Sequence, residues 1–262
     1  RNSTKIFYWV KTLFDKKIII YDHGHAIRLC EGITEKIDDR GKVLFLNFHE
    51  HNRTTFRKRG YHLQYITGYP KFFNEWIDIV KNYPFIDFND MKTVVIYSRH
   101  VHDYYMDVDK YEELLLSSCK AIRKYLPNIK IVVKPHPREN TELIHKILNV
   151  GNITNIFISN ENAAVLAINA VFTITFWGSV ILDALSMNVP AVEYFIESKR
   201  FRELEPKGSS YKNIGIQSVN NKIQLEHFIT SVINERYRKP DIINELFKVK
   251  NVSYLSDYNS FI

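Results

Sequence analysis

The sequence predicts an α/β fold with two domains, each built around a parallel sheet, of which the N-terminal one is incomplete. Three observations support this prediction. Short runs rich in Val, Ile and Phe recur along the chain, they alternate with amphipathic stretches, and turn residues close each run. Strands that alternate with helices are typical of open parallel sheets, because each parallel crossover needs a connection long enough for a helix.

Eight segments are predicted as buried strands of a parallel sheet, because they are short, β-rich runs bounded by turn residues. They are 18–21, 43–48, 62–66, 93–97, 129–133, 156–158, 171–175 and 189–194. Five further segments carry apolar residues at helical spacing and are predicted as helices. They are 111–125, 141–149, 162–170, 179–187 and 225–237.

The best candidate for a domain boundary is a linker at 71–91, which contains Pro84 in its second half. Residues 92–262 hold five predicted strand–helix units, enough for one Rossmann-like domain. Residues 1–70 hold only three, which is typical of the C-terminal part of a second such domain. The chain begins at Arg1 rather than Met, as expected if the start of that domain is missing.

Composition narrows the class of protein. The net charge of +7 suits an anionic membrane face or a phosphorylated substrate. The basic residues are scattered apart from 53–59, and no nucleic-acid-binding motif is present, so we expect no nucleic-acid partner. Cys30 and Cys119 make neither a disulfide framework nor a zinc site, which favours the reducing cytoplasm. No apolar run approaches the roughly 20 residues that span a bilayer.

The clearest candidate site follows the fifth predicted strand, at the strand end where ligands of open parallel sheets bind. Lys134-Pro135-His136-Pro137-Arg138 presents an imidazole between two prolines, which restrict the backbone on both sides. The flanking cations suit an anion, and His136 can donate a hydrogen bond to a phosphate or a leaving-group oxygen. The alternative is a turn with a surface histidine.

A second candidate follows the strand at 171–175. Thr175 ends that strand, and Gly178 and Ser179 open the next predicted helix. Free backbone N–H groups, the helix dipole and a hydroxyl would together bind a phosphate there. The alternative is an ordinary helix cap at Ser179.

Two further strand ends carry polar residues. Ser98 and Arg99 follow the strand at 93–97, and we expect this loop to lie beside the donor phosphates. The nearby His-x-His-Asp spacing at 100–103 invites a metal site, but no third group of ligands follows, so no metal is expected. Glu193, at the last predicted strand end, is a candidate ribose ligand.

The N-terminal part offers a different set of groups. Asp22 and His23 follow the first predicted strand, with His25 and Arg28 close behind. A carboxylate and a histidine at a strand end can supply a general base for an acceptor hydroxyl, so we assign this set to the acceptor side. The alternative is a polar turn.

Taken in order, these motifs resemble the GT-B enzymes of bacterial surface-polymer synthesis. The most similar are the CDP-glycerol glycerophosphotransferases of teichoic acid synthesis and the capsule and sialic-acid transferases with His-Pro and Ser motifs. The resemblance covers about 18–195 and rests on His23-Gly24, Gly68-Tyr69-Pro70, Lys134-Pro135-His136-Pro137 and Gly178-Ser179 with Asp183.

The resemblance implies a GT-B fold and a transferase that moves a sugar or glycerol phosphate from a CMP-, CDP- or UDP-linked donor. His136 would assist departure of the nucleotide, Ser179 and Thr175 would bind its phosphates, and His23 would lie across the site as a base. It further implies a glycan or lipid-linked acceptor, and the basic charge suits peripheral association with the inner face of the cytoplasmic membrane. No cofactor is expected.

Two other functions are compatible with the same residues. A non-hydrolysing sugar-nucleotide epimerase shares the two-domain fold and a similar phosphate-binding segment. A non-catalytic nucleotide- or glycan-binding subunit would keep the fold without turnover, and an incomplete N-terminal domain favours it.

Overall fold

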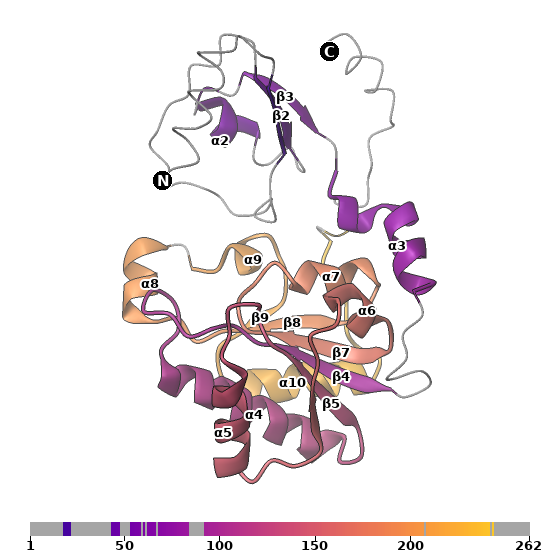
Figure 1. Ribbon diagram of the computed structural model, residues 1–262, viewed down its shortest axis with the longest axis vertical. Coiled ribbons are helices and arrows are strands. Elements are labelled where there is room, and N and C mark those ends of the chain that lie inside the picture. The colour runs from indigo at the N-terminus through magenta and orange to yellow at the C-terminus, as the bar shows by residue number, and fades with distance from the viewer. Residues whose placement is uncertain are drawn as a thin grey trace. The chain divides into compact units, whose positions relative to one another are not determined.

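A computed structural model describes residues 18–21, 43–47, 53–58, 60, 62–66, 68–83, 92–206, 208–241 and 243 of the chain. They belong to two compact units, and the chain passes from the first to the second between Phe73 and Asn74. Each unit is built on a parallel sheet, which confirms the predicted α/β fold with parallel sheets (Figure 1).

The first unit holds a three-stranded parallel sheet in the order β1-β2-β3. Its described elements are β1 (Ile18–Tyr21), β2 (Val43–Asn47), α2 (Arg53–Lys58), β3 (Leu63–Ile66) and η2 (Pro70–Phe72). Helix α2 packs on the sheet through Phe56, whose ring centroid lies 4.2 Å from that of Phe45. Arg57 and Lys58 are exposed, so the densest basic stretch is partly a solvated helix face.

The second unit carries the larger sheet and most of the helices. Its elements are α3 (Asn74–Lys81), β4 (Thr93–Tyr97), α4 (Val108–Tyr125), β5 (Lys130–Lys134), α5 (Thr141–Val150), β6 (Ile156–Ile158), α6 (Ala163–Ile168), β7 (Ala170–Thr175), α7 (Ile181–Ser186), β8 (Ala191–Tyr194), α8 (Lys199–Leu204), α9 (Ser210–Asn213), β9 (Ser218–Val219) and α10 (Lys222–Ile233).

The six strands of this unit are all parallel and lie in the order β6-β5-β4-β7-β8-β9. From β4 the chain first adds β5 and β6 on one side, then returns to add β7, β8 and β9 on the other. This is the strand order of a dinucleotide-binding sheet, and its direction reverses between β4 and β7. Tyr97 pairs with both Lys134 and Thr175, so three strand ends meet at that reversal.

Helices cover both faces of the sheet (Figure 1): α4, α5 and α10 on one face, and α6 and α7 on the other. The residues of β4 alternate between the two faces. Val94 and Ile96 join the fully buried core that includes Leu114 and Ile122 of α4. The side chain of Tyr97 lies on the other face of the sheet, where its hydroxyl donates to the carbonyl of Ala163 at 2.8 Å.

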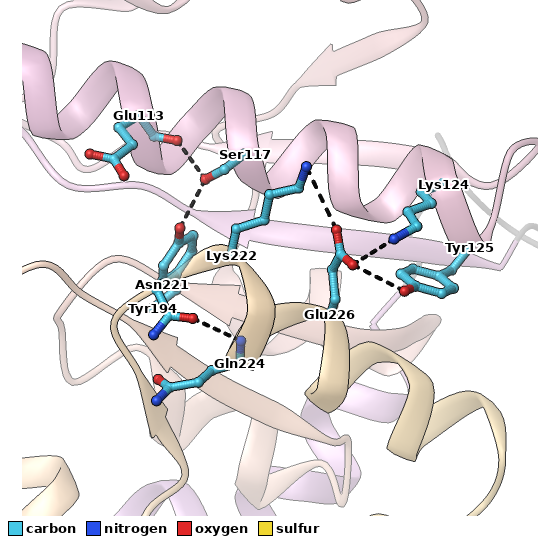
Figure 2. A network of polar contacts seen from close by, with 9 residues as sticks. All are labelled: Glu113, Ser117, Lys124, Tyr125, Tyr194, Asn221, Lys222, Gln224 and Glu226. Carbon is cyan, nitrogen blue, oxygen red and sulfur yellow. Dashed lines mark hydrogen bonds and ion pairs between the residues drawn. The ribbon is translucent and has the colours of Figure 1, made fainter.

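A polar network orients α10 on α4 (Figure 2). The Glu226 carboxylate accepts from Lys124 Nζ at 2.6 Å and from the Tyr125 hydroxyl at 3.1 Å, and Lys222 pairs with it at 3.7 Å. Ser117 of α4 and the hydroxyl of Tyr194 lie 3.0 Å apart in the same view. Exposed ion pairs add little stability, so the apolar core holds this face and the network sets its orientation.

The predicted strands are confirmed, whereas several helix limits differ. Helix α4 begins at Val108 because the Asp107 side chain caps it, accepting from the Lys110 amide at 2.9 Å. Helix α10 begins at Lys222 because Asn221 caps it, and ends four residues before the predicted 237. The short elements α8, α9 and β9 were not predicted.

The predicted linker at 71–91 contains α3, which belongs to the second unit and buries Ile77 and Val80. Within the parts of the chain that the structure describes, no helix has the length and apolar character needed to cross a bilayer.

Candidate functional site

Three loops gather at the carboxyl edge of the larger sheet, where its strand order reverses. They follow β4, β5 and β7. Backbone hydrogen bonds join them directly beyond the strands: the Ser98 amide donates to the carbonyl of Lys134 at 3.1 Å, and the Phe176 amide donates to that of Tyr97 at 2.9 Å. The sequence predicted these three strand ends as candidate donor loops, and the fold brings them together.

Arg99 is the central cation of this edge. Its guanidinium carbon lies 4.8 Å from the ring centroid of Tyr105 and 5.1 Å from that of Trp177, so both rings contact the cation. Its Nε is buried without a hydrogen-bond partner, and no carboxylate forms an ion pair with it among the described residues. Aromatic contacts therefore hold the guanidinium in place, and the carboxylate of Glu139 interacts with its charge from beyond ion-pair distance.

Trp177 is held in an unusual backbone conformation. Its φ of 53° lies in the left-handed region, which costs a residue with a Cβ roughly 1–2 kcal/mol. The indole is buried, stacks on Phe195 at 5.5 Å and meets the edge of Phe201 at 5.2 Å. This packing offsets the backbone cost and fixes the ring beside Arg99. Such strain is characteristic of functional sites.

His136 lies next to His100, with 4.6 Å between the ring centroids. The amide of Arg138 donates to His136 Nδ1 at 3.1 Å, so the neutral ring carries its proton on Nε2. Burial, followed by the neighbouring charges of Arg99, His100, Arg138 and Lys134, lowers the pKa of His136 to about 4. At neutral pH, His136 is therefore an uncharged hydrogen-bond donor, poised to gain a proton if an anion compensates the local charge.

His100 is tied to the same cluster. Its Nε2 lies 2.8 Å from the hydroxyl of Tyr105, and burial, followed by the charge of Arg99, lowers its pKa. The ring of His102 stacks on Tyr105 at 5.1 Å, and its Nδ1 accepts from the amide of Tyr104. In the described part of the chain, no three His, Cys, Asp or Glu side chains are grouped closely enough to hold a metal ion.

Thr175 and Gly178 lie on the β7 side of the cluster around Arg99. The Thr175 hydroxyl is buried with no hydrogen-bond partner. A Cβ placed on Gly178 would lie 3.7 Å from Nη1 of Arg99 and 4.0 Å from Cγ2 of Thr175. The space in front of Gly178 thus adjoins the guanidinium, and a side chain at this position would narrow it.

The expected helix start at Ser179 is wrong. Helix α7 begins at Ile181 and has six residues, and no side chain caps it. The residues from Gly178 onward form tight turns instead, with the Leu182 amide donating to the Ser179 carbonyl at 3.0 Å. The described residues therefore place no helix terminus at Gly178 and Ser179, and phosphate binding by Ser179 stays a prediction.

The other donor-side candidates differ in accessibility. Lys134 is half-buried, and burial lowers its pKa. Pro137 and Arg138 are exposed at the tip of the loop. The Ser98 hydroxyl donates to Glu139 at 2.7 Å, which commits its single proton within the protein. Their contacts with a ligand stay predictions.

Glu193 lies apart from this cluster and is fully buried at the end of β8. Its two carboxylate oxygens accept from the hydroxyls of Ser209 and Ser218, both at 2.7 Å. Burial raises its pKa to about 7. Because both oxygens are already hydrogen-bonded, the carboxylate links β8 to β9 and α9 in this structure, and its expected contact with a ribose stays a prediction.

A cavity of about 320 Å³ follows β8 and β9 at the same edge of the sheet. Glu197, Arg202, Lys212, Asn220 and Gln224 are among the polar residues that line it. None of the residues around Arg99 belongs to this cavity. The geometry of the charged cluster, rather than the size of a cavity, therefore identifies the candidate site.

The sequence did not single out Tyr105 or Glu139. Tyr105 contacts Arg99, and Glu139 accepts from three donors around His136. Glu139 stands three residues after His136, but a carboxylate there is also typical of a solvated loop, so only the fold reveals its burial. The acceptor-side candidates Asp22, His23, His25 and Arg28 lie outside the described residues.

The two parallel sheets define an α/β protein of GT-B-like fold. No protein-family model and no curated protein matches the sequence. Among solved structures, the chain is similar to Methanocaldococcus jannaschii UDP-GlcNAc 2-epimerase in complex with UDP-GlcNAc and UDP. That similarity has 17% identity and a TM-score of 0.51, and covers 81% of this chain and 60% of that one.

The chain is also similar to S. aureus MnaA in a co-structure with UDP, with 12% identity and a TM-score of 0.59. This similarity covers 100% of the chain and 81% of MnaA. At these identities the two likenesses show a shared fold. The chain spans about 60% of the length of the archaeal epimerase.

Proposed function

We propose that the protein is a GT-B-type transferase that binds the phosphates of a nucleotide-activated donor at the cluster around Arg99. The observation that carries the proposal is the Arg99 guanidinium at the strand-order reversal between β4 and β7, which aromatic rings hold and which forms no ion pair among the described residues. Ligands of open parallel sheets bind at such a reversal, and an arginine fork suits the oxygens of a phosphate.

His136 would contact the same phosphates and act on the leaving group. During transfer the bond from the donor carbon or phosphorus to the nucleotide oxygen breaks, and charge builds on that oxygen. The neutral imidazole can donate its Nε2–H to this oxygen, and Arg99 and Lys134 supply positive charge. The acceptor oxygen forms the new bond, and a base at Asp22 or His23 would take its proton.

The transferred group would be a sugar or glycerol phosphate, moved to a glycan or lipid-linked acceptor of the bacterial cell envelope. Two observations support this part of the proposal. The order of motifs along the chain resembles that of surface-polymer transferases, and the net charge of +7 suits an anionic membrane surface. We propose the cytoplasm, at the inner face of the cytoplasmic membrane, as the site of action.

A sugar-nucleotide epimerase is the second candidate, favoured by the likeness to a UDP-GlcNAc 2-epimerase. The two activities differ in what they need. An epimerase converts a free nucleotide sugar without any acceptor, whereas a transferase releases its nucleotide only when an acceptor is present.

The test is a thermal-shift screen of the full chain with CMP, CDP, UDP and GDP, followed by product analysis with the matching donor. One nucleotide should raise Tm, by mass action on the folded state, and His136→Ala should reduce that shift. If no nucleotide shifts Tm, the donor site is assigned wrongly. Conversion of the free nucleotide sugar into its epimer without acceptor would establish the epimerase, and binding without any turnover would indicate a non-catalytic subunit.

A further inference from the structure

The carboxylate of Glu139 lies between the two loops that carry Arg99 and His136. One oxygen, Oε2, accepts from the Ser98 hydroxyl at 2.7 Å and from the His136 amide at 2.8 Å. The other, Oε1, accepts from the hydroxyl of Tyr111, which is fully buried on α4. One side chain therefore joins the β4 loop, the β5 loop and the helix behind the sheet.

Glu139 also makes two hydrogen bonds to the backbone of His136 within the same loop. The Glu139 amide donates to the His136 carbonyl at 2.8 Å, while the Glu139 side chain accepts from the His136 amide. This reciprocal pair fixes the turn in which the Arg138 amide reaches His136 Nδ1. The position of the Nε2–H donor therefore depends on the Glu139 side chain.

The Arg99 side of the cluster depends on the same carboxylate. Ser98 directly precedes Arg99, and its hydroxyl is buried against Glu139. A shift of this carboxylate would move the base of the Arg99 loop and the base of the His136 loop together. Misplacement of a functional group by about 1 Å can cost on the order of 100-fold in activity, so such a support is consequential.

We infer that Glu139 is a positioning residue that holds Arg99 and His136 in register for one phosphate-bearing ligand. It touches neither the ligand nor the reacting atoms, and it acts through the reach of its side chain rather than through its charge. This inference rests on the proposed function for the ligand, whereas the link between Glu139 and the His136 ring is a property of the free protein.

Two conservative variants separate reach from charge. Glu139→Gln keeps the reach: its carbonyl oxygen can accept from Ser98 and His136, and its amide can donate to the Tyr111 oxygen. Glu139→Asp keeps the charge but withdraws the carboxylate by one methylene, so that it cannot span Tyr111 and the two loops together. Tyr111→Phe is the matched control, since it removes only the contact behind the sheet.

The first readout is the ¹⁵N spectrum of the His136 ring in the free protein. We expect Glu139→Gln and Tyr111→Phe to keep the wild-type form, with Nδ1 accepting and Nε2 protonated. Glu139→Asp should give a mixture of ring forms. A wild-type spectrum for Glu139→Asp would overturn the inference, and so would a disturbed spectrum for Glu139→Gln.

The second readout is the affinity for inorganic pyrophosphate, measured by calorimetry with the full chain. We expect about a tenfold or greater loss for Glu139→Asp and a change within about threefold for Glu139→Gln. A larger loss for Glu139→Gln than for Glu139→Asp would assign the role to charge, and equal losses would show that reach alone does not account for it; either result would overturn the inference. If the wild-type protein binds neither pyrophosphate nor any nucleotide, the proposed function fails, while the ring spectrum still decides the role of Glu139.

Discussion

The guanidinium of Arg99 lies over the indole of Trp177, with 5.1 Å between Cζ and the ring centroid. The indole attracts this cation through its aromatic face at the strand-order reversal, and no carboxylate forms an ion pair with the guanidinium among the described residues. Removing the planar guanidinium of Arg99, removing the indole of Trp177 or filling the space beside Gly178 should therefore have separable effects on ligand binding and stability.

Replacing Arg99 by Lys should weaken binding of the nucleoside diphosphate selected by the thermal-shift screen. Lysine keeps the charge but loses the planar fork and its stacking, so we expect a loss of about 10- to 100-fold in Kd. Calorimetry measures this loss. Arg236→Lys is the matched control, since Arg236 is exposed and outside the cluster. Equal affinities for wild type and Arg99→Lys would remove Arg99 from the site.

His136 should titrate far below an ordinary histidine. With a pKa of about 4, its ring stays neutral in the free protein down to mildly acidic pH. A bound phosphate supplies opposite charge and should raise this pKa, because it favours the protonated form. Titration of the ring resonances with and without the nucleotide measures both values. An unchanged pKa in the complex would show that the ligand binds away from His136.

The lowered pKa of His136 also makes the stability of the folded protein depend on pH. The pKa in the folded protein lies below the unfolded value of about 6.5, so the unfolded chain takes up the proton first as the pH falls. The contribution is fully present above about pH 6.5 and is lost as the pH falls toward 4. His136→Gln should therefore lose less stability than the wild type between pH 7 and 5 in urea unfolding. Equal losses of unfolding free energy in the wild type and in His136→Gln between pH 7 and 5 would contradict the low pKa of His136.

Alanine substitutions at Gly178 and Gly215 should have opposite effects on nucleotide binding and on stability. Gly178→Ala places a methyl group at ordinary contact distances, so stability should change little, but the methyl narrows the space beside Arg99 and should weaken nucleotide binding. Gly215→Ala meets no neighbouring atom, yet its φ of 84° should cost roughly 1 kcal/mol or more of stability without affecting binding. Urea unfolding and calorimetry on both variants measure this contrast. Unimpaired binding in Gly178→Ala would place the ligand elsewhere.

Glu193→Gln should stabilise the protein at alkaline pH. Burial raises the pKa of Glu193 to about 7, above its unfolded value, so the folded state binds the proton more tightly. Stability from this group is present below about pH 4.5 and is lost as the pH rises through 7. Glutamine imitates the protonated acid between Ser209 and Ser218, so the variant should gain up to about 3 kcal/mol at pH 8 and little at pH 5. A gain of the same size at both pH values would contradict this account.

The described strands were predictable from sequence because parallel strands buried on both faces are largely apolar and are bounded by turn residues. The segments that became β4 and β6 were predicted with their observed limits. Helix limits were less predictable, since they depend on which side chain caps the first turn. Asp107 caps α4, whereas Ser179, which has the composition of a cap, lies in a turn before α7.

The candidate site was predictable in part for the same reason. His136, Arg99 and Thr175 each directly follow or end a predicted strand, so the parallel topology alone brings their loops to one edge. Strand order places these loops side by side, and sequence does not reveal it. Tyr105 and Glu139 belong to the cluster through tertiary packing, for which a tyrosine or a glutamate in a loop carries no sequence signal.

Because all six strands of the larger sheet run the same way, the candidate site lies at the carboxyl ends of the strands, and their amino ends lie at the opposite edge. Asn128 is exposed at the opposite edge, just before β5, and the five residues of that strand span about 16 Å at 3.3 Å per residue. A fluorescent probe attached at position 128 would lie about one strand length from the His136 loop and would leave every group discussed above untouched.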